Sequence, residues 1–220
     1  TLTEREQADG WKLLFDGTSS AGWRGAHKDA FPESGWVIEN GCLKVLASGG
    51  AESQGGGDIV TIDQYGNFDL FFEFMITEGA NSGVKYFVSE AYPTAGSAIG
   101  LEYQILDDQR HPDAKMGRDG NRTLSSLYDL IPAANKRFNG VGQWNAAHIV
   151  SVNGHVEHWL NGFKVLEYER GSEEYRKLVS ESKYKVFAGF GEAEHGHILL
   201  QDHGNEVAFR SIKIRQEARG

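Results

Sequence analysis

The sequence has a single cysteine, Cys42, among its 220 residues, so no disulfide can form within the chain. One thiol also gives none of the paired cysteine spacings that structural zinc sites use. Because Cys42 lies in a strand-like run, we predict that it is a small buried apolar side chain.

Positive charge and long apolar runs are also scarce. The formal net charge is −9, and nucleic-acid binding needs a basic face, so no nucleic-acid partner is expected. No apolar run reaches the roughly 20 residues of a membrane-spanning helix. No signal peptide is visible in the chain either.

Several familiar site motifs are absent. The sequence contains no G-x-S-x-G elbow and no H-E-x-x-H helix, and "GGGDI" lacks the lysine of a phosphate-binding loop. Asp58, Asp63 and Asp69 do not have the spacing of a calcium-binding EF-hand loop. The sequence therefore specifies no cofactor, although its Glu and His side chains are of the kinds that bind a divalent cation.

Glycine is abundant: 28 residues, against four prolines, which suits an all-β protein with many tight turns. Strand-like runs recur from end to end: 11–15, 35–46, 58–62, 68–76, 82–88, 100–106, 144–169, 184–190, 197–202 and 206–215. Asn-Gly pairs at 40–41, 153–154 and 161–162 predict tight hairpins. We therefore predict one domain over 1–220, with its core at about 10–215, built as a β-sandwich of two antiparallel sheets.

One or two short helices are expected within this sandwich. Thr3 and Glu6 have the spacing of a capping box, and Ser172 precedes acids that favour the first turn of a helix. The loop over 107–123 is long for a connection without regular structure, which is typical of a lid or a binding loop.

Alternation along three strands places a polar set on one face. In the run 68–76 the residues Phe68, Leu70, Phe72, Phe74 and Ile76 should face the core, and in the run 82–88 the inward set should be Val84, Tyr86 and Val88. If these strands and 100–106 are neighbours, one outer face carries Glu73, Lys85, Glu102 and Gln104, with Asn81, Gly83 and Phe87 on the same side. Acids, an amide, a lysine and aromatic rings together suit a carbohydrate site, and a plain solvated face is the alternative.

The histidines follow the same strand logic. His158 and Trp159 point to opposite faces of their strand, so one of them faces the core. Gln201 and His203 share one face near a strand end. A histidine in a strand is either a structural residue or part of the polar site, and the alternation alone leaves both interpretations open.

Seven segments, in order from about residue 10 to 215, resemble the 3-keto-disaccharide hydrolase domain family: "GWKLLFDGTSSAGWRG", "GWVIENGCLKV", "YGNFDLFFEFMITEGANSGVKYFV", "GLEYQILDD", "GQWN", "VEHWLNG" and "GHILLQDHGNEVAFRSIKIR". The resemblance implies a concanavalin A-like lectin/glucanase jelly roll whose concave sheet carries the active site. It also implies an exported bacterial protein, periplasmic or on the cell surface, with an oligosaccharide or glycoside as its partner and no specified oligomeric state.

The segment Ile99–Asp108 also nearly matches the E-x-D-x-x-E strand of β-glucan-cleaving jelly rolls, but Gln104 replaces the middle acid. The family's chemistry explains this change. A ketone at C3 acidifies the C2 proton, so a base can remove it, the C1 oxygen leaves, and water adds to the unsaturated sugar. That route needs a base, an acid and a group that stabilises the enolate, but no second catalytic carboxylate at position 104.

The resemblance and the strand faces together give hypotheses for each role. The base is His158 or His203, Lys85 stabilises the enolate oxygen, and Glu102 donates a proton or holds a metal ion. The residues expected to bind or orient the substrate are Gln104, Asp107, Glu73, Gln201, Asn81 and Arg118, the last of these on the predicted lid.

Two other functions compete with this one. A non-catalytic carbohydrate-binding module would use the same fold without a base, an acid and an enolate-stabilising group. An ordinary glycosidase would pair Glu102 with Glu73 or Asp107 across the bond, at a separation of about 5–9 Å. Because Gln104 interrupts the usual strand, this last interpretation ranks below the other two.

Overall fold

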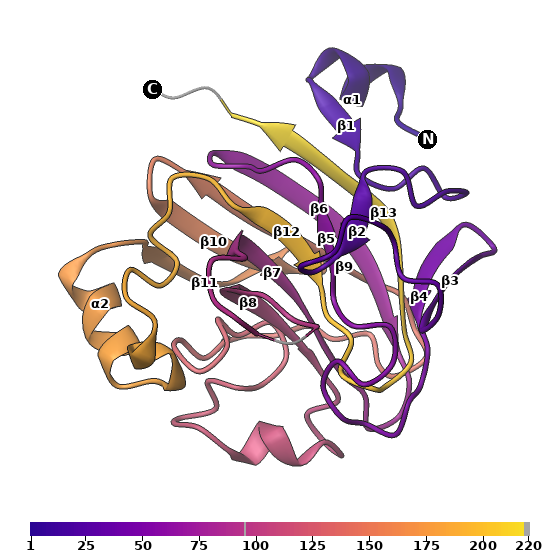
Figure 1. Ribbon diagram of the computed structural model, residues 1–220. Coiled ribbons are helices and arrows are strands. Elements are labelled where there is room, and N and C mark those ends of the chain that lie inside the picture. Colours follow the sequence, from indigo (N-terminus) through magenta and orange to yellow (C-terminus); the bar gives the residue numbers. More distant parts are fainter. Residues whose placement is uncertain (95, 218–220) are drawn as a thin grey trace.

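Two antiparallel β-sheets pack face to face in the computed structural model, which describes residues 1–94 and 96–217 (Figure 1). The predicted fold class is confirmed, and the expected domain of 1–220 includes positions 95 and 218–220, which lie outside the described residues. None of the described helices is long and apolar enough to cross a membrane.

The larger sheet has eight strands. Its order is β11 (Phe163–Glu169), β10 (His155–Leu160), β9 (Asn145–Val152), β6 (Phe68–Ile76), β13 (Val207–Gln216), β4 (Cys42–Val45) and β3 (Trp36–Glu39), and β1 (Trp11–Leu13) also pairs with β13. Strands from the first third of the chain and from its last third thus pair in one layer. Cys42 lies half-buried at the start of β4, so the prediction of a buried thiol is wrong because the hairpin end is open to solvent.

The smaller sheet has five strands and carries the site described below. Its order is β2 (Trp23–Gly25), β5 (Ile59–Thr61), β12 (His197–Leu200), β7 (Asn81–Ser89) and β8 (Ile99–Leu106). The predicted run 184–190 is not a strand. After a turn that begins at Ser182, it forms the short helix η2 (Lys183–Val186), and its rings Tyr184 and Phe190 stack at 4.1 Å instead of alternating across a sheet.

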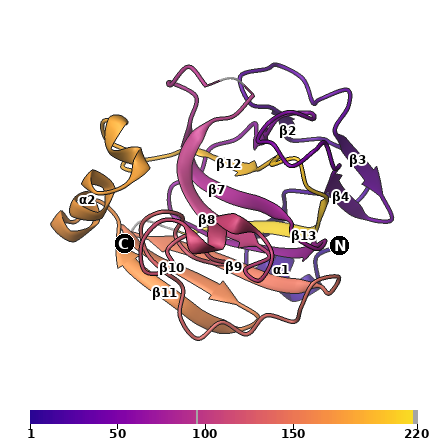
Figure 2. The ribbon, with the colours of Figure 1, turned by 90° about the horizontal axis from the view of Figure 1, so that it is seen from below.

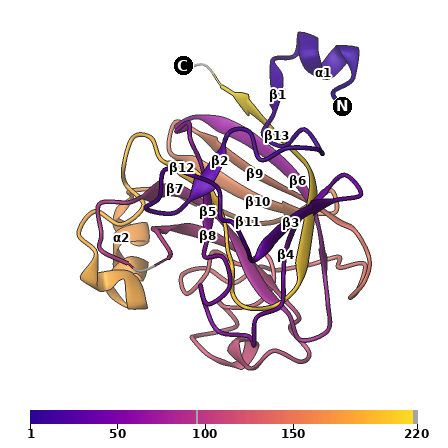
Figure 3. The same ribbon diagram turned by 45° about the vertical axis from the view of Figure 1, so that its right-hand side comes forward.

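Both predicted helices are present at the expected caps. Thr3 and Glu6 form a capping box at the start of α1 (Glu4–Ala8), and the Ser172 hydroxyl accepts a hydrogen bond from a backbone N–H of α2 (Glu173–Ser180). The long connection after β8 contains η1 (Pro112–Lys115) and closes the lower end of the sandwich (Figures 1 and 2). The pair α1 and β1 lies at the opposite end (Figure 3).

The three Asn-Gly pairs turn the hairpins β3–β4, β9–β10 and β10–β11. Every Asn and Gly in them has a positive φ, for example 50° at Asn40 and 74° at Gly41. Turns of this backbone shape match the twist of paired strands, and Asn and Gly adopt it with little strain. The short-range signal was therefore sufficient to place all three turns.

Alternation also predicts the core face of β6, where all five expected side chains are at most 1% exposed. On β7 it fails after Tyr86. A bulge gives Phe87 a φ of 50° and turns its ring into the core, while Val88 moves to the outer face beside Ala98 and Leu199. Gly196 allows this bulge, because a Cβ atom there would overlap the backbone of Phe87.

Candidate active site

A pocket of about 360 Å³ lies on the outer face of the smaller sheet, away from the core. Strands β7 and β8 and the end of β12 form its floor, and connecting segments form its walls. Its lining residues are Glu52, Ser53, Asn81, Lys85, Thr94, Ser97, Ile99, Glu102, Gln104, Asp113, Tyr128, Lys183, Tyr184, Phe187, Gln201 and His203.

Lys85 and Glu102 occupy the centre of the floor. They are directly opposite each other in the β7–β8 register, and each is only 5% exposed. Gly83 comes two residues before Lys85 on the same face, and a Cβ atom there would overlap the Glu102 carboxylate. The missing side chain at position 83 therefore makes the space in which this carboxylate lies.

Asp58 lies behind Lys85, just before β5. Its Oδ2 is 3.8 Å from Lys85 Nζ, and Nζ also donates a hydrogen bond to the Ala98 carbonyl oxygen at 3.3 Å. Burial opposes the charge on Lys85, but the carboxylates of Asp58, Glu102 and Glu52 outweigh it, so the pKa of the ammonium is raised. At the floor the lysine is therefore a buried cation held among acids.

The two acids beside Lys85 also have shifted pKa values. Burial raises the pKa of the Glu102 carboxyl to about 7, while Lys85 and Lys183 act in the opposite direction. Burial likewise raises the pKa of Asp58 to about 7, against the pull of Lys85. A carboxyl group with such a pKa can hold or release a proton near neutral pH, as acid–base catalysis requires.

The pocket contains hydrogen-bonding atoms without partners. Eight buried side-chain atoms of the described residues lack a hydrogen bond, and four belong to the pocket lining: Ser53 Oγ, Gln104 Oε1, Gln201 Oε1 and His203 Nδ1. Gln104 Nε2 donates to the Arg122 carbonyl oxygen at 3.1 Å. Buried polar atoms are normally paired, so these free atoms indicate a site prepared for a polar ligand.

Aromatic rings form part of the wall. Tyr128 lies beneath the Lys183 ammonium, with Nζ 4.9 Å from the ring centroid. At the rim, Phe187 packs edge-to-face against Tyr92 with centroids 4.9 Å apart, and the Tyr92 hydroxyl donates to the Ala188 carbonyl oxygen at 2.7 Å. Polar floor and aromatic wall together match the requirements of a sugar ring.

The structure contradicts the placement of His158 in the site. Alternation along β10 turns this histidine into the core, where it is 0% exposed. Its Nδ1–H donates to the Ser125 carbonyl oxygen at 2.9 Å, and its Nε2 lies 2.8 Å from the Tyr86 hydroxyl, which also bonds Tyr168 at 2.7 Å. Burial lowers the pKa of His158 to about 4, so the ring is neutral and structural.

Glu73 is also misplaced by the prediction, because β6 belongs to the larger sheet and is not a neighbour of β7. Its carboxylate accepts two hydrogen bonds from Arg210, both at 3.0 Å, and one from the Ser211 hydroxyl at 2.6 Å. The expectation that these strands share a face failed because connectivity along the chain does not specify which sheet a strand joins.

Two further predicted residues lie outside the pocket lining. Arg118 forms a surface ion pair with Glu181, with Nη1 2.7 Å from the carboxylate. Asp107 is buried at the end of β8, where its carboxylate accepts the backbone N–H groups of Gly79 at 2.8 Å and Gln109 at 3.1 Å. Both roles are structural, since the partners belong to loops and not to the pocket.

Six predicted residues do meet in the pocket: Lys85, Glu102, Gln104, Asn81, Gln201 and His203. The predictions missed Asp58, Glu52, Lys183 and Tyr128. For Asp58 a signal was present, since this acid directly precedes the apolar run "IVTI" and is therefore drawn into the sheet. Glu52 and Tyr128 come from loops and Lys183 is the first residue of η2, and nothing in their local sequence marks them.

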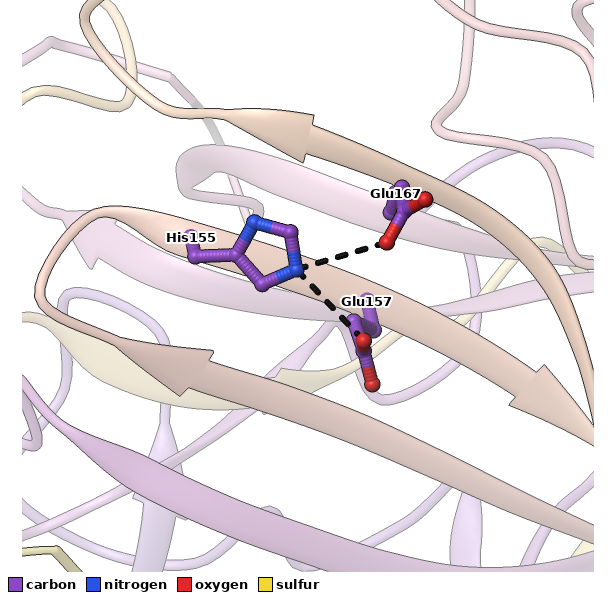
Figure 4. A group of neighbouring side chains, drawn as sticks. All are labelled: His155, Glu157 and Glu167. Atoms are coloured by element: carbon purple, nitrogen blue, oxygen red, sulfur yellow. Dashed lines mark hydrogen bonds and ion pairs between the residues drawn. The ribbon is translucent and has the colours of Figure 1, made fainter.

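A separate group of potential metal ligands lies on the hairpin β10–β11 (Figure 4). His155 Nε2 is 3.4 Å from Glu157 and 3.5 Å from Glu167. Lys164 already pairs with both acids, at 3.2 and 2.6 Å. Among the described residues no other set of three His, Cys, Asp or Glu ligands is this close, so the pocket acids do not form a compact ligand set.

Comparisons with known proteins agree with the geometry. Residues 10–215 match a family described as 3-keto-alpha-glucoside-1,2-lyase-like domain. The chain is 39% identical to a 3-keto-disaccharide hydrolase from Bacteroides thetaiotaomicron, a match that covers 94% of this chain and 79% of that protein.

Solved structures give the same fold. A protein from Parabacteroides distasonis, assigned as a glycosyl hydrolase, is 30% identical, with a TM-score of 0.86 and 99% of each chain covered. A Bacillus subtilis protein with a galectin-like fold, 14% identical with 90% of each chain covered, has a TM-score of 0.52. At that identity the second likeness concerns the fold alone.

Proposed function

Because the chain belongs to the 3-keto-alpha-glucoside-1,2-lyase-like domain family, we propose that the pocket on its smaller sheet cleaves glycosides whose sugar carries a ketone at C3. The family and the 39% identical relative show that the protein is a glycoside-acting hydrolase. One observation supports the finer proposal most strongly. A buried ammonium, a carboxyl group with a pKa of about 7 and an imidazole line one pocket in which four buried side-chain atoms lack protein partners.

The residues fit an elimination better than a direct displacement. Direct glycoside hydrolysis uses two carboxylates on either side of the bond. Here Gln104 takes the place of a second acid on β8. Of the other acids lining the pocket, Asp113 is paired with Arg122 at 3.1 Å and Glu52 is an exposed loop residue, while the buried Asp58 lies behind Lys85 and outside the lining. A 3-keto sugar needs one cation near its ketone oxygen instead, and Lys85 supplies it.

One residue of the pocket can be assigned to each proton transfer and charge stabilisation of this elimination. His203 takes the C2 proton, and the electron pair forms an enolate whose C3 oxygen is stabilised by the Lys85 ammonium. The enolate restores the ketone, the C1–C2 double bond forms, and the C1–O bond breaks. Glu102, whose raised pKa of about 7 lets its carboxyl group hold a proton up to near neutral pH, gives that proton to the departing oxygen. Water then adds at C1 and a proton returns to C2, which completes a net hydrolysis.

The lining also suggests how the substrate lies. Gln104, Gln201 and Asn81 are gathered at one end of the floor, and the free Oε1 atoms of the two glutamines are acceptors for sugar hydroxyl groups. Ile99 and Phe187 give an apolar surface at the other end. We assign the keto sugar to the polar end and the leaving group to the apolar end.

A chromogenic 3-keto glucoside tests the proposal directly. The protein is incubated with it and with the unoxidised parent glucoside, each with and without a chelator. Release from the keto substrate alone supports elimination, and chelator sensitivity then reports whether a divalent cation takes part. Release from the parent alone would restore a two-carboxylate mechanism. Sugar binding without turnover of either substrate would identify a carbohydrate-binding module.

A further inference from the structure

We propose that Asp58 is a positioning residue: from behind the pocket, its carboxylate keeps the Lys85 ammonium charged and directed at the substrate. This rests on the proposed function of the pocket. Asp58 is absent from the pocket lining and 1% exposed, so it does not touch the substrate and acts through its neighbours, of which Lys85 is its one ionic partner.

The orientation of Asp58 is fixed on one side only. Its Oδ1 accepts the backbone N–H of Asp202 at 2.8 Å, which holds the carboxylate at the edge of β5. Its Oδ2 makes no hydrogen bond and lies 3.8 Å from Lys85 Nζ. An acid needed only to satisfy the Asp202 N–H would not require this second oxygen, whose one ionic partner is the lysine.

Lys85 has donors to spare on the pocket side. An ammonium carries three N–H donors, and Nζ uses one of them on the Ala98 carbonyl oxygen at 3.3 Å. A lysine buried without an acid loses its proton readily, because desolvation can lower its pKa by up to about 3–5 units. Asp58 opposes this loss without entering the space that the substrate needs.

Several charged groups face Lys85, and the test must separate their effects. Asp58, Glu102 and Glu52 act on it electrostatically, and the other charged or titratable groups lining the same pocket are Lys183, Asp113, Tyr128, Tyr184 and His203. Removing Asp58 also withdraws a negative charge from Glu102. The pH profile of activity alone would therefore mix two groups, and Lys85 has to be observed directly.

The experiment compares Asp58→Asn with the unmodified protein by NMR of ¹³C-labelled lysine, with the Lys85 Cε signal assigned by its loss in Lys85→Met. Asparagine retains an oxygen for the Asp202 N–H. We expect the Lys85 titration midpoint to fall by at least about one pH unit, a tenfold loss of proton affinity. We also expect the alkaline limb of kcat on the 3-keto glucoside to move to lower pH, with KM little changed.

Asp202→Asn is the matched control. Asp202 is equally buried, but its carboxylate accepts only backbone N–H groups, those of Gly55, Gly57 and Gly204. It should lower stability and leave the Lys85 midpoint in place. An unchanged Lys85 midpoint in Asp58→Asn would overturn the proposal. A shifted midpoint in a protein that cleaves no 3-keto glycoside would support the contact and reject the proposed function.

Discussion

Two buried polar clusters of this protein differ in one respect, although strand β7 of the smaller sheet contributes to both. In the core, His158, Tyr86 and Tyr168 form a chain in which each polar atom has a partner at 2.7–2.9 Å. On the outer face, Lys85 and Glu102 lie in a pocket where four buried side-chain atoms have no hydrogen-bond partner. Burial is equally deep in the two clusters, so burial alone does not distinguish a structural group from a functional one.

The difference lies in what completes each cluster. When every polar group of a buried network is hydrogen-bonded, these bonds offset the free-energy cost of removing the groups from water. Such a network stabilises the folded protein. In a pocket with unpaired polar atoms, the free-energy cost of removing them from water is not offset until a ligand supplies the missing hydrogen bonds. The core histidine is thus expected to matter for stability and the pocket residues for activity.

The sharpest test of this separation is Lys85→Met. Methionine keeps much of the side-chain volume but removes the cation that stabilises the enolate, so we expect kcat/KM on the 3-keto glucoside to fall by about 100- to 1000-fold. The urea midpoint is compared at about pH 5, where Asp58 and Glu102, each with a pKa of about 7, are neutral and need no counter-ion; there it should stay the same or rise, because a buried charge is removed. Lys164→Met, on the outer face of the larger sheet, is the control and should retain activity. An active Lys85→Met would break the comparison.

Glu102→Gln should lower kcat by about 100-fold through loss of the proton donor. Its effect on stability follows from the raised pKa of about 7 against an ordinary 4.5. The neutral acid is favoured in the folded state, so this group's stabilisation is full below 4.5 and is lost as the pH rises through 7. The glutamine variant should therefore gain stability relative to the unmodified protein at about pH 8, and the gain should shrink towards about pH 5. Urea unfolding at both pH values measures it, and a larger gain at the acidic value would refute this sign.

His158→Ala should do the opposite of the pocket variants. It leaves a cavity and removes the partners of Tyr86 and of the Ser125 carbonyl group, so we expect a loss of about 2–4 kcal/mol in the free energy of unfolding. Below the melting temperature, kcat/KM should remain within about twofold of the unmodified protein. Urea titration and initial rates on the same sample separate the two effects. A large loss of kcat with unchanged stability would return His158 to the site.

The smallest effect is expected for Arg118→Ala. Its ion pair with Glu181 is in contact with solvent, and pairs of this kind contribute little to stability. Neither KM nor the urea midpoint should change measurably. A clear increase in KM would show that the loop over 107–123 closes on the substrate, as the sequence alone suggested.

Local signals were sufficient for much of the fold. Asn-Gly pairs, capping residues and the alternation of β6 concern groups within a few residues of each other, and each was reproduced in the structure. Lys85, Glu102 and Gln104 were placed on an outer face by the same alternation. The bulge at Phe87 was not predictable, because the close approach of Gly196, far away in the sequence, allows it.

The sequence by itself determined a two-sheet sandwich, its hairpins and the polar faces of β7 and β8, because side-chain alternation and turn chemistry act over short distances. Only the tertiary structure decided which strands share a sheet, and so removed Glu73 from the site and turned His158 into the core. It also placed Asp58 behind Lys85, through the pairing of β12 with both β5 and β7. Long-range pairing depends on the packing of the whole core, and no single segment contains that information.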